Sequence, residues 1–234
     1  QPAPLPLQRG LRPVTWLLDN FDVVLGYTKT HLYLSLVPLF VGLLIAIPLG
    51  TVIRNTRWVR RITLTVASIA FTLPSLALFV TIPAVVGLPV LDPLNVVIAL
   101  SVYSTALLVR AVPEALDSVP FAVVDSAEAM GYSSQRRALT VELPLALPVL
   151  IANIRVVAVT NISLVSVGSV IGIGGLGQLF TQGYQRDYPD QIFAGIISIV
   201  FLALIFDAAL FLLGRRLTPW TRLSTGSSKK KARA

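Results

Sequence analysis

The sequence has few charged residues and no cysteine. Only 13% of its 234 residues are Asp, Glu, Lys or Arg, whereas 55% are hydrophobic. This balance is far from that of a soluble domain. Without cysteine there is no disulfide, no Cys metal site and no Cys nucleophile. We therefore expect a membrane protein.

Other absences bear on catalysis. The sequence has no G-x-x-x-x-G-K-[ST] phosphate-binding loop, so we expect that it does not hydrolyse ATP. It has one histidine, no H-E-x-x-H motif, no cluster of acidic residues and no credible Ser/His/Asp set. We therefore predict that the chain is not an enzyme and holds no metal or cofactor of its own.

Long apolar runs occupy most of the chain. About 20 apolar residues are needed to cross a bilayer as a helix. Five segments qualify, at roughly residues 31–53, 62–86, 96–112, 145–170 and 192–213. The predicted fold is an all-α polytopic membrane protein with five transmembrane helices, located in the cell membrane.

The basic residues predict the orientation of these spans, because cytoplasmic loops carry an excess of Lys and Arg. Thirteen of them follow spans one, three and five, whereas four lie on the opposite side. The N-terminus is therefore expected outside and the C-terminus in the cytoplasm. The basic residues are split among loops beside membrane spans and show no recognition motif, which argues against nucleic-acid binding.

We divide the chain into an extracellular segment 1–30, a transmembrane domain 31–214 and a basic cytoplasmic tail 215–234, which could contact anionic lipid. Residues 1–13 lack an apolar core, so no cleavable signal peptide is expected. After them, Thr15 is a candidate N-cap. The helix that it would start either lies along the outer membrane interface or extends span one.

A polar stretch, DSAEAMGYSSQRRALTVELP (125–144), interrupts the apolar chain on the predicted cytoplasmic side. Asp125 and Ser126 are favourable first-turn residues, and Gly131 is suited to a left-handed helix end. Ser133 or Ser134 would then cap a second helix over residues 135–143. A polar helix exposed between two spans is most simply a docking element.

The spacing of this stretch resembles the cytoplasmic loop of importer permeases of the ATP-binding cassette (ABC) class. Their pattern is E-A-A-x-x-x-G, nine residues, then I-x-L-P. Here it falls on Asp125, Ser126, Ala127, Gly131, Val141, Leu143 and Pro144. Asp for Glu keeps a carboxylate and Ser for Ala keeps a small residue. The resemblance implies that these residues couple the chain to a cytoplasmic ATPase.

Further stretches resemble the osmoprotectant branch of this family, whose members import glycine betaine, carnitine and choline. They are LPSLALF (73–79), VELPLALPVLIANIR (141–155) and VIGIGGLGQL (170–179). The resemblance implies two cytoplasmic ATPase subunits that bind ATP and Mg, an extracellular substrate-binding protein and a second permease subunit. Methionine importer permeases share the five-span layout and remain an alternative. An ATP-independent transporter or channel subunit is the rival from another class.

The glycine run at residues 172–177 matches G-x-G-x-x-G, but it lacks the βαβ context of a dinucleotide site. We interpret it as an outer re-entrant or cap element, with a plain extracellular loop as the alternative. By family resemblance, it and the LPSLAL stretch would border the translocation path. The candidate path or gate residues are Pro74, Ser75, Gly172, Gly174, Gly175 and Gly177.

Ionisable residues within spans are costly, so each is a candidate for function. Arg155 and Asp207 both fall in the inner half of the membrane, and we predict that they form an ion pair, with lining of an inner vestibule as the alternative. Arg110 and Glu114, four residues apart, are expected to pair at the inner interface. His31 is expected to be an interfacial residue at the outer end of span one.

Overall fold

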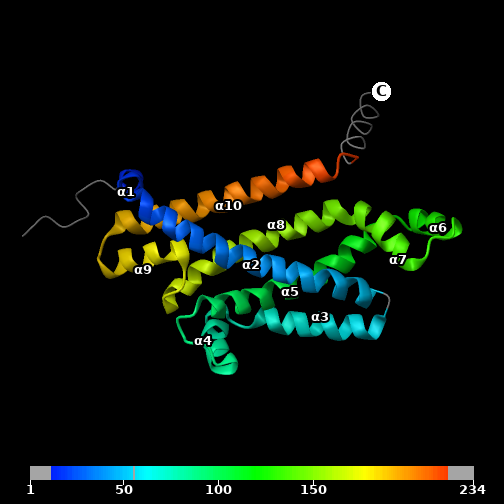
Figure 1. Ribbon diagram of the computed structural model, residues 1–234, viewed down its shortest axis with the longest axis horizontal. Helices are drawn as coiled ribbons and strands as arrows, with labels where there is room; N and C mark the ends of the chain where they lie inside the picture. Colours follow the sequence, from blue (N-terminus) through cyan, green and yellow to red (C-terminus); the bar gives the residue numbers. More distant parts are fainter. Residues whose placement is uncertain (1–11, 55, 221–234) are drawn as a thin grey trace, which may run out of the picture.

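The computed structural model describes residues 12–54 and 56–220, and every regular element within these ranges is a helix. The described residues contain four helices long and apolar enough to cross a membrane, or five if one sharply bent pair counts as a single span. The four are α2 (Phe21–Arg54), α5 (Pro93–Asp117), α8 (Leu143–Val167) with its flanking turns, and α10 (Pro189–Leu217). They run roughly along one axis (Figure 1).

The second predicted span is not a straight helix. It consists of α3 (Arg57–Thr72) and α4 (Ser75–Val86), which are bent by 102° at the break between them. Leu73 and Pro74 are both extended there, because proline disfavours helical geometry in the residue before it. As a result, α4 leaves the bundle axis (Figure 1).

The expectation that the N-terminal segment extends span one is confirmed from Phe21 onward. A short helix, α1 (Pro13–Asp19), precedes α2, which begins at Phe21 and so extends span one by about three turns. Thr15 is not the N-cap, since α1 begins at Pro13 and the Thr15 hydroxyl donates to the Arg12 carbonyl at 2.8 Å. The Arg12 amide in turn donates to Asp190 Oδ1 at 2.7 Å, tying this end to α10.

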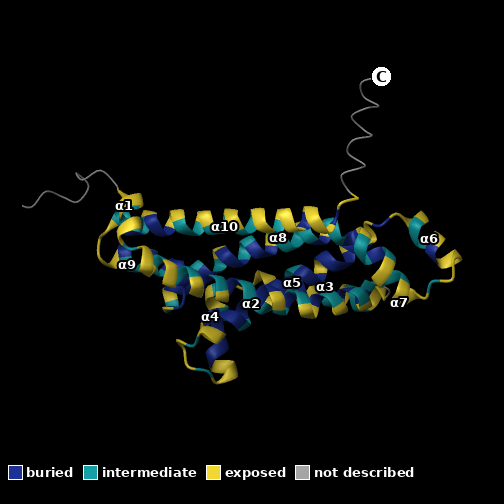
Figure 2. Ribbon diagram, turned by 45° about the horizontal axis from the view of Figure 1, so that its top comes forward, coloured by how far each residue is buried: buried dark blue, intermediate teal, exposed yellow. Residues whose placement is uncertain are grey.

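Helix α5 forms the centre of the bundle and contacts α2, α3, α4 and α8. Its start is fixed by Asp92, which accepts from the Leu94 amide at 2.9 Å, followed by Pro93 in the first turn. In an apolar stretch of 18 residues within α5, 67% of the residues are buried. The corresponding share in α10 is 6%, because α10 lies at the periphery. Figure 2 shows this contrast as a mostly exposed α10 beside buried inner helices.

The close approach of α2 and α5 depends on glycine. A Cβ at Gly42 would lie 2.6 Å from Ser104 Cβ, and a Cβ at Gly50 equally close to Val112 Cβ. Small residues at such points allow helix backbones to pack closely within a membrane. Beside Gly42, the Asn161 side chain donates to Ser104 Oγ at 2.9 Å and to the Ser35 carbonyl at 3.1 Å, linking α8, α5 and α2.

At one end of the bundle lie two short helices, α6 (Phe121–Ala129) and α7 (Ser134–Arg137) (Figure 1). A π-helical segment, η2 (Ala138–Glu142), continues α7 directly into α8. At the opposite end, two 3-10 turns, η3 (Gly168–Ile171) and η4 (Gly175–Gly177), lead into α9 (Gln178–Gln185). Helix α1 and the C-terminal end of α10 also lie at opposite ends of the bundle (Figure 1). The tail from residue 221 onward is outside the described residues.

Candidate functional site

The polar stretch forms two helices joined by a tight turn, as expected, but the first helix begins earlier than predicted. Helix α6 starts at Phe121, after an extended Pro120, so Asp125 and Ser126 lie in its middle rather than in its first turn. The apolar residues Val123 and Val124 explain the earlier start, because they pack against the inner core of the bundle. The helix is thereby held against the bundle by one face.

Gly131 ends α6 in the left-handed conformation, with φ +81°. Its amide donates to the Glu128 carbonyl at 2.8 Å, and the Tyr132 amide donates to the Ala127 carbonyl at 3.1 Å. These two bonds define a Schellman motif, which satisfies carbonyls that the helix end would otherwise leave unpaired. Ser133 then caps α7 by accepting from the Arg136 amide at 3.4 Å.

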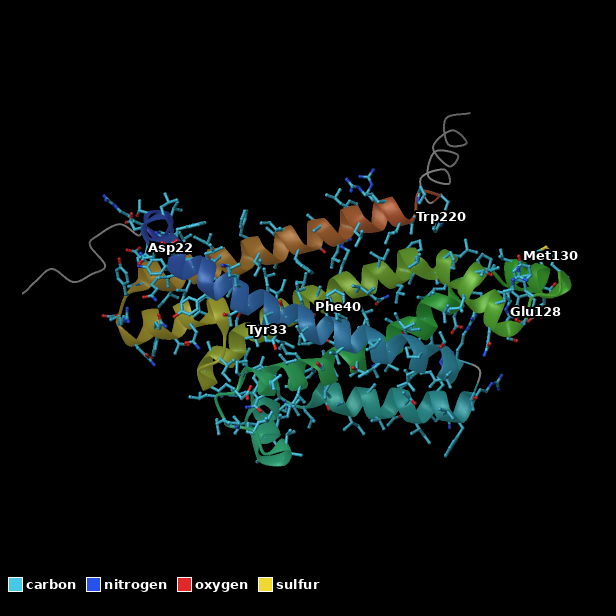
Figure 3. The ribbon with its side chains drawn as sticks, viewed as in Figure 1. Asp22, Tyr33, Phe40, Glu128, Met130 and Trp220 are labelled. Carbon is cyan, nitrogen blue, oxygen red and sulfur yellow. The ribbon has the colours of Figure 1, made fainter. Side chains whose placement is uncertain are left out.

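The residues of the predicted coupling pattern divide between two faces of α6. Ala127 is buried against the bundle, whereas Asp125 and Ser126 are exposed. Sequence reasoning missed the two largest exposed apolar side chains of this loop, Phe121 (80% exposed) and Met130 (70%). The signal that could have found them is the presence of large apolar residues beside or within a polar stretch that is predicted to lie in the cytoplasm. Figure 3 places Met130 and Glu128 at the tip of the molecule.

The last three residues of the pattern lie away from this exposed face. Val141 is half-buried within the π-helical segment, and Leu143 packs against the inner core. Pro144 occupies the first turn of α8. The predicted second helix over residues 135–143 is therefore not a separate element, since α7, η2 and α8 are continuous. These three positions anchor the loop to the bundle.

Three charged residues at the base of the loop were not predicted as a site. Glu142 is buried, and its two carboxylate oxygens accept from Arg54 of α2 and Arg137 of α7. Arg54 and Arg137 had entered the sequence reasoning only as markers of membrane orientation. No local spacing signals their pairing, because Arg54 and Glu142 are 88 positions apart in sequence.

At the other end of the bundle, the glycine run forms a compact turn rather than an open loop. Gly172 adopts φ +89°, and a Cβ at Gly174 would lie 2.4 Å from Ser169. A Cβ at Gly177 would lie 2.7 Å from the Ser166 carbonyl oxygen. The run therefore folds back on the end of α8, and η4 also contacts α2.

His31 holds this turn in place. The expectation that it is an interfacial residue is wrong. Its side chain is fully buried. Its Nδ1 accepts from the Leu176 amide at 3.2 Å, so Nε2 carries the proton and donates to the Ile162 carbonyl at 2.9 Å. A Cβ at Gly175 would lie only 2.8 Å from His31 Cα. One neutral imidazole thus joins α2, α8 and the glycine turn.

Pro74 and Ser75 mark the break between α3 and α4. The Leu73 carbonyl, freed by this break, accepts from the Tyr103 hydroxyl of α5. Helix α4 contacts η3, and a Cβ at Gly172 would lie 3.1 Å from Leu91 in the loop after α4. The structure therefore brings the α4 region and the glycine turn together, and their role as path or gate residues stays a prediction.

Arg155 and Asp207 form a bidentate ion pair between α8 and α10, with Nε–Oδ1 at 2.8 Å and Nη2–Oδ2 at 2.6 Å. Their side chains remain about one-third exposed (29% and 34%). The Arg155 guanidinium also lies over the Phe211 ring, 5.0 Å from its centroid. Such pairing reduces the cost of placing both charges within a span.

The expected pair of Arg110 and Glu114 does not form. Arg110 donates instead to Ser68 Oγ of α3 at 3.1 Å, because α3 packs along this side of α5. Glu114 is exposed and makes no ion pair within the described part of the chain.

Comparisons with known proteins agree with this architecture. Residues 39–222 match the model of a family described as binding-protein-dependent transport system inner membrane component. The chain is 34% identical to the osmoprotectant import permease protein OsmW of Salmonella typhimurium over 209 residues, which cover 88% of this chain and 97% of that protein. It is 32% identical to the carnitine transport permease protein OpuCB of Listeria monocytogenes, over 88% of this chain and 93% of that one.

Among solved structures, the chain is similar to one of the methionine ABC transporter MetNI in an inward-facing conformation. The TM-score is 0.73 at 24% identity, with 88% of this chain and 99% of that chain covered. At that identity the likeness shows the fold alone. Together with the family match, it confirms the predicted all-α fold of an importer permease. The chain belongs to the family of binding-protein-dependent transport system inner membrane components and is a permease subunit of an ABC importer.

Proposed function

We propose that the chain imports quaternary-ammonium osmoprotectants, the class that contains glycine betaine, carnitine and choline. The names of the relatives support this substrate class, since OsmW is an osmoprotectant permease and OpuCB a carnitine permease. The likeness to a methionine transporter concerns the fold and gives no comparable support for methionine. Selectivity would rest mainly with an extracellular binding protein, in which an aromatic cage recognises the quaternary ammonium group.

The energy for import comes from a separate ATPase subunit, which binds ATP and Mg and receives α6 in a surface groove. The observation that carries this proposal is the exposed side of α6, where Phe121 and Met130 flank Asp125 and Ser126 along the chain. Helix α6 lies at one end of the molecule (Figure 1). A short helix with apolar anchors and small residues is suited to lie in such a groove. Met is adaptable in such contacts.

In this mechanism, ATP binding draws two ATPase subunits together and moves the docked α6 helices of two permease subunits. The two bundles then change from an inward-facing to an outward-facing arrangement, and hydrolysis resets them. Such a switch requires that ATP favour one of the two states through different contacts. The second permease subunit, identical or homologous, would cover apolar surface that the single chain leaves exposed, as on α10.

The test of docking is co-purification of the permease with its ATPase subunit. We expect the native chain to retain the ATPase, and a chain in which residues 125–131 are replaced by a Gly/Ser linker of equal length to lose it while still inserting in the membrane. Undiminished ATPase binding by the linker variant would disprove the docking assignment. For the substrate, binding of glycine betaine, carnitine, choline and methionine to the partner binding protein distinguishes the two importer classes.

A further inference from the structure

Six charged side chains form a continuous chain of ion pairs across the end of the bundle that carries α6. The order is Arg60, Asp117, Arg54, Glu142, Arg137 and Glu128. These residues come from α3, the end of α5, α2, η2, α7 and α6, respectively. The chain thus connects the docking helix to helices α2, α3 and α5 of the bundle.

Glu142 is the centre of this chain. Its side chain is 1% exposed, the least of the six. Oε2 accepts from Arg54 Nη1 and Oε1 from Arg137 Nε at 2.6 Å. A buried carboxylate is tolerated when it is paired on both oxygens, and removing one partner leaves a costly unpaired charge. The planar guanidinium groups also fix the directions of these bonds.

On one side of Glu142, the connection reaches the docking helix. Arg137 binds Glu142 through Nε and Glu128 of α6 through Nη1. The backbone joins α6 to α7 only through the turn at residues 130–133. The Glu128–Arg137–Glu142 bridge therefore adds a second, shorter path between α6 and the start of α8.

On the other side, the connection reaches three further helices. Arg54 binds Asp117 Oδ1 at 2.9 Å and also donates to the Leu116 carbonyl at 3.2 Å, both at the end of α5. Arg60 of α3 binds the other oxygen of Asp117 at 3.0 Å. The Arg54–Glu142 pair is thus the point at which α2 and α5 meet the segment that leads from α7 to α8.

The π-helical segment explains how Glu142 reaches this position. Residues Ala138–Glu142 form a wide turn that ends at Glu142. Such π segments in otherwise α-helical chains occur frequently at functional sites. The wide turn rotates the start of α8 relative to α7, so that Glu142 is directed into the bundle and is buried. Leu139, in the same π-helical segment, remains 66% exposed.

We propose that Glu142 is a positioning residue that transmits displacement of α6 to the transmembrane helices. This inference rests on the proposed function, because it assumes that an ATPase moves α6. A rigid ion-pair junction makes α2, α5 and α8 follow that movement. Without the junction, α6 moves with the ATPase while the bundle follows incompletely, so that ATP is hydrolysed without transport.

The test measures ATP hydrolysis and substrate uptake in the same proteoliposomes. These contain the complete complex of permease, ATPase and binding protein, and glycine betaine is the substrate supplied. For Glu142→Gln we expect ATP hydrolysis within about twofold of the native rate. The amount of substrate taken up per ATP hydrolysed should fall about tenfold, which is the size of effect that is typical when coupling between two sites is lost. The matched control is Glu114→Gln, at the end of α5 that carries Asp117. Glu114 is an exposed carboxylate that forms no ion pair with any other described residue. Its ratio of uptake to hydrolysis should be unchanged.

If Glu142→Gln takes up as much substrate per ATP hydrolysed as the native protein, the inference is overturned. A parallel fall of hydrolysis and uptake would also overturn it, because loss of structure or of docking lowers both. If Glu142→Gln yields no folded complex, Glu128→Gln decides the question. Glu128 is exposed (58%), and its replacement leaves Glu142 paired with both arginines. We expect a smaller fall in uptake per ATP for Glu128→Gln, and an unchanged ratio there would refute the inference.

Failure of the proposed function gives a different result. It appears in the native complex, as an ATPase that does not bind or as uptake that does not depend on ATP. Failure of the Glu142 inference appears only in the variants, beside a native complex that couples hydrolysis to uptake normally.

Discussion

Single glycine residues fix the two turns that matter most for function, and each requires glycine for a different reason. Gly131 requires glycine for its left-handed backbone angle, φ +81°. Space is not the reason, because a Cβ there would meet no atom within 4 Å. Gly175 requires it mainly for space, because a Cβ there would approach the backbone of His31. The two positions therefore predict different consequences of substitution.

Replacement of Gly131 should impair coupling through backbone strain. A left-handed conformation costs a non-glycine residue about 1–2 kcal/mol, and asparagine tolerates it better than valine. We expect Gly131→Val to insert normally but to lose most ATP-driven uptake, and Gly131→Asn to retain most of it. Uptake assays on membranes with equal amounts of each protein check this, and normal uptake by Gly131→Val would argue against the turn.

Replacement of Gly175 should lower stability through steric overlap. A methyl group forced against His31 costs about 1–3 kcal/mol, and we expect Gly175→Ala to lower the midpoint of thermal unfolding. The control is Gly26→Ala in α2, where a Cβ has open space and alanine favours the helix by about 1 kcal/mol. Equal midpoints for Gly175→Ala and the native permease would contradict the packing of the glycine turn on His31.

At the scale of elements, the docking helix exposes apolar anchors that the family pattern does not include. Phe121 is 80% exposed at the start of α6. We expect Phe121→Ala to weaken ATPase binding about tenfold or more, as for an aromatic anchor seated in a pocket. Phe40→Ala is the matched control, because Phe40 is also exposed (68%) but lies within α2, away from α6 (Figure 3).

The measurement is the affinity of the purified ATPase subunit for each permease variant in detergent. A loss confined to Phe121→Ala supports a groove that receives this end of α6. Equal affinities for both variants would mean that α6 docks without Phe121.

The elements that could be predicted from the sequence are those with local signals. The turn at Gly131 and a cap at Ser133 or Ser134 follow from residue type, and the structure shows that Ser133 is the cap. The long spans follow from the length of the apolar runs. The start of α6 was misplaced because its apolar first turn, residues 121–124, was not considered as part of the helix. The π-helical segment and the pairing of Glu142 with Arg54 have no local signal, since they arise only when α2, α5 and α8 pack together.

At the scale of the whole molecule, orientation in the membrane is predicted from the basic residues. Helices α7 and α9 lie at opposite ends of the bundle (Figure 1). Ser133 caps α7 and Tyr184 lies in α9, and both residues are exposed. Because the sequence has no cysteine, each can be labelled singly. In intact cells that express the permease without its partners, a membrane-impermeant maleimide should react with Tyr184→Cys and not with Ser133→Cys.

Permeabilisation should then expose Ser133→Cys, and the cysteine-free parent gives the background. Labelling of Ser133→Cys alone in intact cells would reverse the assigned orientation. It would also place α6 outside the cell, where no ATPase could reach it.

The shape of the bundle was less predictable than its composition. Five apolar runs predicted five spans, and the structure shows that Pro74 breaks the second into α3 and α4 at a bend of 102°. Proline was recognised at that position, yet residue type alone does not distinguish a tolerated kink from a full break. The outcome depends on tertiary contacts, here the Tyr103 hydroxyl on the freed Leu73 carbonyl and α4 against η3.

The central claim is that ATP hydrolysis on a partner subunit drives import through this chain. It is tested most directly by uptake of glycine betaine into proteoliposomes that contain the permease, its ATPase and its binding protein. We predict uptake that requires ATP, persists after ion gradients are collapsed and is abolished when residues 125–131 are replaced by the linker. Uptake driven by an ion gradient in the absence of ATP would contradict the account.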